Sequence, residues 1–237
     1  MEIKLEQYEK LHDIRCGGLK LIQNIHGFRY GTDAVLLAQF VKLKKGDEVL
    51  DFCTGSGIIP LILWHKGKAS KITGIEINEE VAATAVKTVQ INNLQGKVDF
   101  VCGDIKRASK ILNHSYDVVT CNPPYSKSGS GKVSEMDNIA RARYELDCTL
   151  DDVAKNAAKV LKFGGRFYIV HKAERLADII SACRKYRLEP KELQFVHTKK
   201  EKNAELVLLC AVLGAGVQVN VLPPVIISER EEQHGRD

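Results

Sequence analysis

The feature that most constrains the fold is a regular alternation, after residue 45, of short apolar runs with segments whose apolar residues recur at helical spacing. Because strands connected through helices run parallel, this alternation predicts an open parallel sheet with helices on both faces. Strands are expected at 48–52, 71–77, 98–102, 116–121 and 166–170, and helices at 58–64, 79–92, 150–161 and 173–186.

The last two predicted strands break this alternation. Residues 193–197 and 206–213 read as strands with only a polar turn between them, and strands joined so tightly must be antiparallel. We therefore expect an α/β fold with a doubly wound, mostly parallel sheet of seven strands that ends in an antiparallel hairpin. The expected domains are an N-terminal cap (1–45, with a helix that Thr32 or Asp33 caps and that runs to Phe40), a main domain (46–215) and a charged C-terminal tail (216–237).

Composition narrows the class of protein. The chain is 44% hydrophobic and 27% charged, which is ordinary for a globular protein, and its net charge of +5 is compatible with an anionic partner. Seven cysteines without a CxxC pair favour buried thiols in a reducing compartment over disulfides or a zinc site. No apolar run approaches the ~20 residues of a membrane span. We expect a cytoplasmic protein without a metal.

The turn after the first predicted strand, Asp51-Phe52-Cys53-Thr54-Gly55-Ser56-Gly57, has the composition of a cofactor loop. Glycines there let the backbone pass close to a ligand. A dinucleotide enzyme would need a third glycine where this chain has Pro60, so a nicotinamide dehydrogenase is disfavoured. The segment instead resembles the first motif of class I methyltransferases, with Cys53 in place of the first glycine. The resemblance implies S-adenosylmethionine as cofactor, with Asp51, Cys53, Gly55 and Gly57 at its site.

Two further acids follow predicted strands, at the sheet edge where open α/β sheets bind ligands. Glu76 comes 19 residues after Gly57, and its carboxylate can accept both hydroxyls of a ribose. Asp104 follows the third strand and can accept from an adenine amino group. Each acid could instead be a helix cap or part of a solvated loop.

The motif that indicates the reaction is Asn122-Pro123-Pro124-Tyr125, directly after the fourth strand. An exocyclic amine or an amide has its lone pair delocalised, so it is a poor nucleophile. The Asn122 side-chain oxygen and the Pro123 carbonyl can accept its two N–H bonds, and Asn122 also borders the cofactor. The prolines remove N–H donors and fix the backbone, and Tyr125 offers a flat face for stacking. Asn122, Pro123 and Tyr125 are the predicted catalytic residues, and Pro124 and Tyr125 are predicted to bind substrate.

The N-terminal region narrows the family. Phe28 to Ala38, Leu21 to Gln23 and Ala142 to Glu145 resemble the tRNA(1)(Val) adenine-37 N6-methyltransferase family, although Tyr144 stands where the family often has histidine. The resemblance implies the strand order of class I methyltransferases and a tRNA substrate. It also implies that Tyr30, Gly31 and Thr32 contact the cofactor, and Arg143 could meet a phosphate. Arg141 and Arg143 are predicted to bind substrate, although both could belong to a solvated loop.

Basic residues near the end of the chain suit an RNA partner. Residues 184–202 contain seven Lys or Arg and three Glu. Lys199, Lys200 and Lys202 crowd the predicted hairpin turn, and we expect them to bind RNA, although such runs are often only solvated faces. Two other hypotheses stay open. One is glutamine N5-methylation of a protein, which is disfavoured because enzymes of that kind usually carry a helical substrate domain too large for residues 1–45. The other is a non-catalytic RNA-binding module. The sequence does not predict an oligomeric state.

Overall fold

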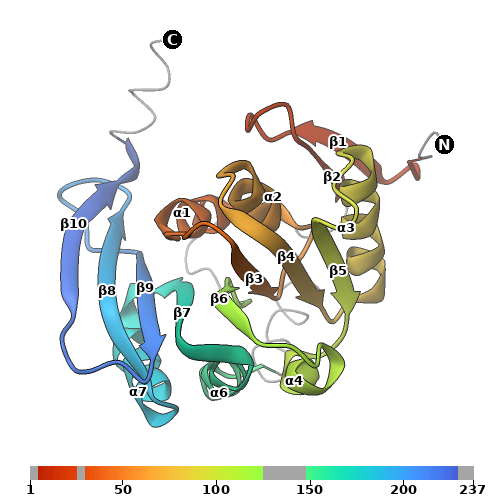
Figure 1. Cartoon of the computed structure of the whole chain (residues 1–237). Coiled ribbons are helices and arrows are strands. Elements are labelled where there is room, and N and C mark those ends of the chain that lie inside the picture. Colours follow the sequence, from red (N-terminus) through yellow and green to blue (C-terminus); the bar gives the residue numbers. More distant parts are fainter. Residues whose placement is uncertain (1–4, 26–29, 125–147, 229–237) are drawn as a thin grey trace.

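The computed structural model describes residues 5–25, 30–124 and 148–228. Its strands are β1 (Glu9–Asp13), β2 (Lys20–Asn24), β3 (Asp47–Phe52), β4 (Ala69–Glu76), β5 (Val98–Cys102), β6 (Tyr116–Cys121), β7 (Leu161–Lys172), β8 (Leu188–His197), β9 (Leu206–Leu213) and β10 (Asn220–Ile226). The α-helices are α1 (Thr32–Phe40), α2 (Ile58–His65), α3 (Glu79–Ile91), α4 (Ala108–Ile111), α6 (Leu150–Val160) and α7 (Leu176–Lys185), and the short 3-10 helices are η1 (Ile105–Arg107) and η2 (Ala173–Arg175). Figure 1 shows their arrangement.

The central sheet confirms the predicted architecture. Its strand order is β10-β8-β9-β7-β6-β3-β4-β5, and β5, β4, β3, β6 and β7 pair in parallel. The antiparallel strand β9 lies between β7 and β8, as the tight connection to β8 requires. β8 therefore runs parallel to β7, and the turn that follows it lies at the carboxyl edge of the parallel strands.

Apolar clusters cover both faces of this sheet. One cluster joins α1 and α2, and Val89 of α3, to residues of the strands such as Val49 and Val118. The other joins α6 and α7 to the opposite side chains, such as Leu50 and Val119. Consecutive residues of a strand thus face opposite layers, and because both layers are apolar the strands read as nearly continuous apolar runs.

The eighth strand corrects two expectations. We predicted seven strands and a tail from residue 216, but Asn220–Ile226 pairs in parallel with β8 at the edge of the sheet. Val225 is buried, whereas Val221 is 59% exposed. Pro223 and Pro224 disfavour a strand in the sequence because proline cannot donate to the ladder, but the register shifts between Leu222 and Val225, and an edge strand tolerates prolines.

The N-terminal cap begins as an antiparallel hairpin, β1 with β2, that packs on α3. Its hydrogen bonds to this helix span the whole hairpin: the Lys87 ammonium donates to both Glu9 oxygens, and the Ile22 amide donates to the Thr88 hydroxyl. Helix α1 follows at the predicted position. Its N-cap is Gly31, without a side-chain cap bond, and not Thr32 or Asp33 as expected. No described helix is both long and apolar enough to cross a membrane.

Candidate active site

The parallel strands bring the predicted residues to one edge of the sheet. Phe52 of β3 is level with Cys121 of β6 on one side and Ile75 of β4 on the other, and Glu76 is level with Cys102 of β5. The segments that begin at Cys53, Asn122 and Asp104 therefore leave the sheet at the same edge. This edge, the carboxyl edge, holds the candidate site.

The turn after β3 has the conformation that its glycines allow. Gly55 and Gly57 have φ angles of 56° and 91°, in the left-handed region. A Cβ on Gly57 would lie 2.4 Å from Cζ of Phe100, so no side chain fits there. Cys53 has a φ of 54° and so keeps the turn where the family motif has glycine, although a left-handed residue with a side chain is strained.

Asp51 lies beneath this turn, fully buried. One carboxylate oxygen accepts from the Thr54 hydroxyl at 2.6 Å and the other from the Thr120 hydroxyl at 2.5 Å. Burial raises the pKa of Asp51 to about 7, and the two hydroxyl donors offset part of that effect. Asp51 therefore ties the turn to β6. Neither Thr54 nor Thr120 was predicted from the sequence; a hydroxyl residue three positions after a buried acid indicates Thr54, but no local pattern indicates Thr120.

Glu76 and Asp104 follow β4 and β5 as predicted. The Glu76 carboxylate accepts from the backbone amides of Gly55 at 2.9 Å and Asn78 at 3.0 Å, so it also fixes the turn. A carboxylate has about four lone-pair directions, and these two bonds leave acceptor capacity for a ligand. Asp104 caps η1 through the Lys106 amide at 2.8 Å, which is the alternative role that its sequence position allowed.

Asn122 follows β6 directly. Its Oδ1 is buried and has no hydrogen-bond partner among the described residues. Buried acceptors are usually satisfied, so an orphaned one marks a place where a donor from a ligand or water is expected. Pro123 is buried and Pro124 half-buried beside it. Tyr125 and the predicted Arg141 and Arg143 lie outside the residues that the structure describes.

Three thiols lie close to the site. Cys53 and Cys148 pack against the apolar cluster that contains the buried Cys121. The neighbouring Cys121 thiol raises the pKa of Cys53, and burial raises the pKa of Cys121. Neutral thiols are weak nucleophiles, so this trio packs under the turn and does not attack a substrate. All seven cysteines are free, but the expected burial holds only for Cys121, Cys183 and Cys210, since Cys102 is exposed and the other three are half-buried. Within the described ranges, no three His, Cys, Asp or Glu residues are grouped to hold a metal.

The predicted lysine turn lies at the same edge. Lys199, Lys200 and Lys202 connect β8 to β9, and none of them forms an ion pair with a described residue. The turn is held by the Lys202 amide on the Lys199 carbonyl and by the His197 ring on the Lys202 carbonyl. Three strand steps of about 4.8 Å separate β8 from β6, so the turn lies about 14 Å from the strand that carries Asn122.

Comparisons with known proteins decide the family. The model of the methyltransferase small domain matches residues 29–185. The chain belongs to this family. A predicted O-methyltransferase from Agrobacterium tumefaciens has a similar structure, with a TM-score of 0.66 and 20% identity over 82% of this chain and 86% of the other. The YcgJ protein of Bacillus subtilis is also similar, with a TM-score of 0.55 and 13% identity over 79% of this chain and all of the other. The fold is therefore that of class I methyltransferases.

Two curated relatives share a more specific name. The chain is 29% identical over 205 residues to the tRNA1(Val) (adenine(37)-N6)-methyltransferase of Phocaeicola vulgatus, covering 86% of this chain and 80% of the relative. It is 28% identical over 187 residues to the Porphyromonas gingivalis protein of the same name, covering 76% and 72%. This methyltransferase uses S-adenosylmethionine. The open space beside Gly55, the acceptor capacity of Glu76 and the Asn122 oxygen without a partner among the described residues fit such a ligand.

Proposed function

We propose that this methyltransferase modifies the exocyclic N6 of an adenine in tRNA, with an anticodon-loop adenine as its target. The observation that carries the proposal is the buried Asn122 Oδ1, which has no hydrogen-bond partner in the described part of the chain. It follows the strand next to the cofactor turn, where an acceptor for an amino group is needed. The names of the curated relatives support an adenine in tRNA as the substrate.

The chain's own groups account for the activation of the amine. Asn122 Oδ1 and the Pro123 carbonyl accept the two N–H bonds of the amino group, which localises its lone pair and fixes its direction. When bound, S-adenosylmethionine supplies an electrophilic methyl group on a sulfonium. A nitrogen–carbon bond forms as the carbon–sulfur bond breaks, and the amine then loses one proton to water. Positioning and electrostatics supply most of the acceleration.

The cofactor is assigned to the carboxyl edge of β3, β4 and β5. Glu76 accepts the ribose hydroxyls, and Asp104, whose carboxylate keeps acceptor capacity beside its cap bond to the Lys106 amide, accepts from the adenine amino group. The turn at Cys53, Gly55 and Gly57 passes along the ligand, with Asp51 beneath as its support. Tyr30, Gly31 and Thr32, at the start of α1, close the pocket; the N-cap Gly31 offers no side-chain cap, so backbone amides at this helix start suit an anionic carboxylate.

The substrate is assigned to the side of Asn122 away from the cofactor acids. Pro124 and Tyr125 hold the adenine face, and Arg141 and Arg143 contact phosphates. Lys199, Lys200 and Lys202, which form no ion pair with a described residue, lie at the same edge, on the β8 side of Asn122. An exposed, uncompensated group of lysines suits a phosphate backbone.

Replacement of Asn122 tests the acceptor role. Asn122→Ala removes the side-chain oxygen, so methyl transfer to an unmodified tRNA transcript should fall by about 10²–10³. Asn122→Asp keeps an acceptor and should retain more turnover than the alanine variant. Titration calorimetry should find the affinity for S-adenosylmethionine little changed in both, and mass spectrometry of the nucleosides should identify N6-methyladenosine as the product.

Asn156 of α6 provides a matched control. Its Oδ1 is also buried without a partner among the described residues, but its amide nitrogen donates to the Asp152 carbonyl within the helix. Asn156→Ala should therefore retain turnover. Undiminished turnover of Asn122→Ala would contradict the acceptor role. Methylation of a release factor and not of tRNA would instead favour glutamine N5-methylation, which needs the same two acceptors.

A further inference from the structure

A cationic surface lies at the edge of the sheet opposite the candidate site. At this amino edge β3, β4, β6 and β7 begin, and the turns that lead into the strands carry exposed basic side chains. We call these residues the N-edge surface: Arg15, Lys20, Lys44, Lys45, Lys68 and Lys97. No sequence motif predicts it, because its members come from four separate segments of the chain.

Backbone contacts bring three of these segments together. The Gly46 amide donates to the Lys68 carbonyl at 2.8 Å, which joins the turn before β3 to the turn before β4. The Ile72 amide donates to the Lys97 carbonyl at 2.9 Å, which adds the turn before β5. The Lys97 ammonium lies 5.9 Å from the centroid of the Trp64 ring, at the end of α2.

The N-terminal hairpin supplies the fourth segment. The Lys20 amide donates to Asn92 Oδ1 at 2.8 Å, and the Asn92 amide returns a bond to the Lys20 carbonyl at 2.6 Å, so Lys20 is fixed at the end of α3. At the hairpin tip, a Cβ on Gly17 would lie only 2.7 Å from the His65 ring, so the tip rests against the end of α2. Arg15 therefore extends the same surface.

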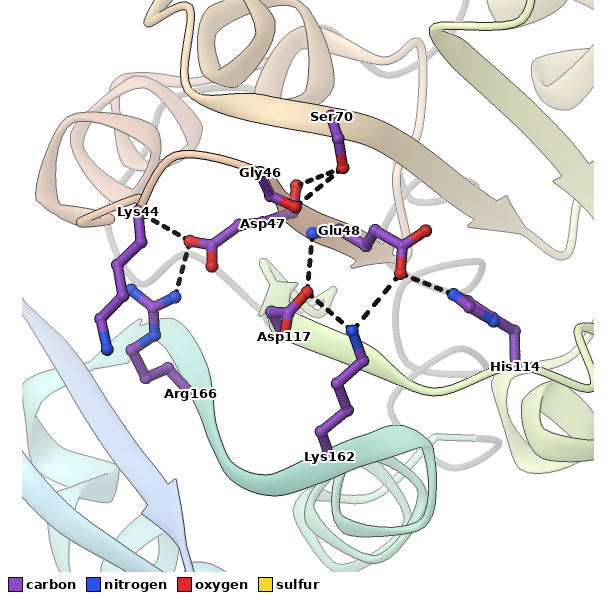
Figure 2. A network of polar contacts seen from close by, with 9 residues as sticks. All are labelled: Lys44, Gly46, Asp47, Glu48, Ser70, His114, Asp117, Lys162 and Arg166. Atoms are coloured by element: carbon purple, nitrogen blue, oxygen red, sulfur yellow. Dashed lines mark hydrogen bonds and ion pairs between the residues drawn. The ribbon is translucent and has the colours of Figure 1, made fainter.

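The carboxylates of Asp47, Glu48 and Asp117 at this edge are already engaged by other cations (Figure 2), whereas Asp13 in the hairpin accepts the Arg15 backbone amide. Arg166 pairs with Asp47 at 2.6 Å, and Lys162 bridges Asp117 and Glu48 at 3.0 and 3.4 Å. Figure 2 shows this network along the starts of the strands, with the Lys44 side chain directed away from it.

Lys71 and Asp99 form a further pair at 2.9 Å. None of the six N-edge cations forms an ion pair with any residue in the described part of the chain.

Two observations support an excess of positive charge at this edge. Six cations exceed the formal net charge of the whole chain, +5, so the remainder of the molecule is close to neutral. Lys66 lies within this edge and donates to the carbonyls of Gln39 and Val41. Its pKa is lowered by burial first and by the charge of Lys68 second.

The shape and chemistry of the surface fit a polyanion. The six side chains are exposed and spread over adjoining turns, without a buried polar group that would select a small anion. Six residues of β3, at about 3.3 Å each, place this edge about 20 Å from the candidate site. We propose that the N-edge surface binds the phosphate backbone of the tRNA substrate, at a distance from the methylated base. This proposal rests on the proposed function.

Removal of one positive charge from each of two adjacent turns tests whether the N-edge surface binds tRNA. The double variant Lys45→Gln/Lys68→Gln should weaken binding of a labelled tRNA transcript by about tenfold and reduce the slope of log K against log salt by about 2, since each phosphate contact contributes about 1. In turnover assays, KM for tRNA should rise while kcat at saturating tRNA and the affinity for S-adenosylmethionine stay unchanged. Both side chains are exposed and unpaired, so the midpoint of thermal unfolding should not move.

The matched control is Lys155→Gln/Lys159→Gln on α6, an equal loss of charge from two exposed lysines without ion pairs among the described residues. It should leave tRNA binding at the wild-type level. Unchanged affinity and salt slope in the N-edge variant, or equal losses in both variants, would overturn the proposal. Failure of the wild type to methylate tRNA would instead reject the proposed function, and the binding measurements would still decide whether RNA contacts this surface.

Discussion

At the residue scale, Gly55 and Gly57 of the turn after β3 differ in whether their surroundings leave room for a Cβ atom. Both have left-handed φ angles, but only Gly57 would place a Cβ against a neighbour, 2.4 Å from Phe100, while Gly55 has open space around it. Gly57→Ala therefore adds steric overlap to backbone strain, and we expect a loss of about 2–4 kcal/mol in unfolding free energy, against about 1–2 kcal/mol for Gly55→Ala. Chemical denaturation of the two variants measures the difference; equal losses would contradict the assigned contact.

Asp51 gives a second prediction at this scale. Its pKa is raised to about 7 in the folded chain, mainly by burial, whereas an unfolded aspartate titrates near ~3.9. The stability contributed by protonated Asp51 is therefore fully present below about pH 4 and is lost as pH rises through about 7. Asp51→Asn cannot ionise, so its unfolding free energy relative to the wild type should rise by roughly 4 kcal/mol between pH 4 and pH 8.

Glu48 provides a control of opposite sign for this pH dependence. Its pKa is lowered, with the hydrogen bond from His114 as the largest cause, so its contribution is present above its unfolded pKa and is lost as pH falls. Glu48→Gln should accordingly lose stability relative to the wild type as pH rises. Denaturant titrations at several pH values measure both variants. If the stability of both variants relative to the wild type changed in the same direction with pH, burial would not control the pKa of Asp51.

At the element scale, β10 shows how a weak sequence signal can still form a strand. The segment contains two prolines and an exposed valine, Val221, yet its backbone pairs with β8 and its one deeply buried side chain, Val225, joins the core. Edge pairing needs hydrogen bonds on one side only, so prolines cost less there than in a central strand.

A pair of valines tests whether β10 belongs to the folded unit. Val225 is 6% exposed and Val221 is 59% exposed in the same strand. Val225→Ala should cost about 1–2 kcal/mol of unfolding free energy, and Val221→Ala less than about 0.5 kcal/mol. Equilibrium denaturation of both variants gives the comparison. Equally small effects would mean that β10 frays from the sheet in solution.

At the scale of the whole molecule, the cofactor site gathers residues from most of the sheet, so a ligand there should stabilise the entire chain. S-adenosylmethionine at 100 times its Kd should add about 2.7 kcal/mol to the unfolding free energy, which raises Tm by about 5–10 °C for a chain of this size. Thermal unfolding at increasing concentrations measures the shift. NAD serves as the control ligand, because Pro60 breaks the dinucleotide pattern; a shift with NAD and none with S-adenosylmethionine would contradict the cofactor assignment.

The sequence by itself determined the alternation of strands and helices from β3 to β9 and the common edge for the residues that follow β3, β4, β5 and β6, but neither the N-terminal hairpin nor β10. Hydrophobic periodicity and the placement of glycines can be read locally from the sequence. The carboxyl ends of parallel strands lie at one edge of the sheet, so residues that follow these strands meet there. Only the tertiary structure decided which groups meet across long separations. Thr120 reaches Asp51 over 69 residues, and Asn92 holds Lys20 over 72. Such contacts depend on the register of packed elements, which no local pattern encodes. They explain why Asp51 supports the turn after β3 and why basic residues from separate segments form one surface.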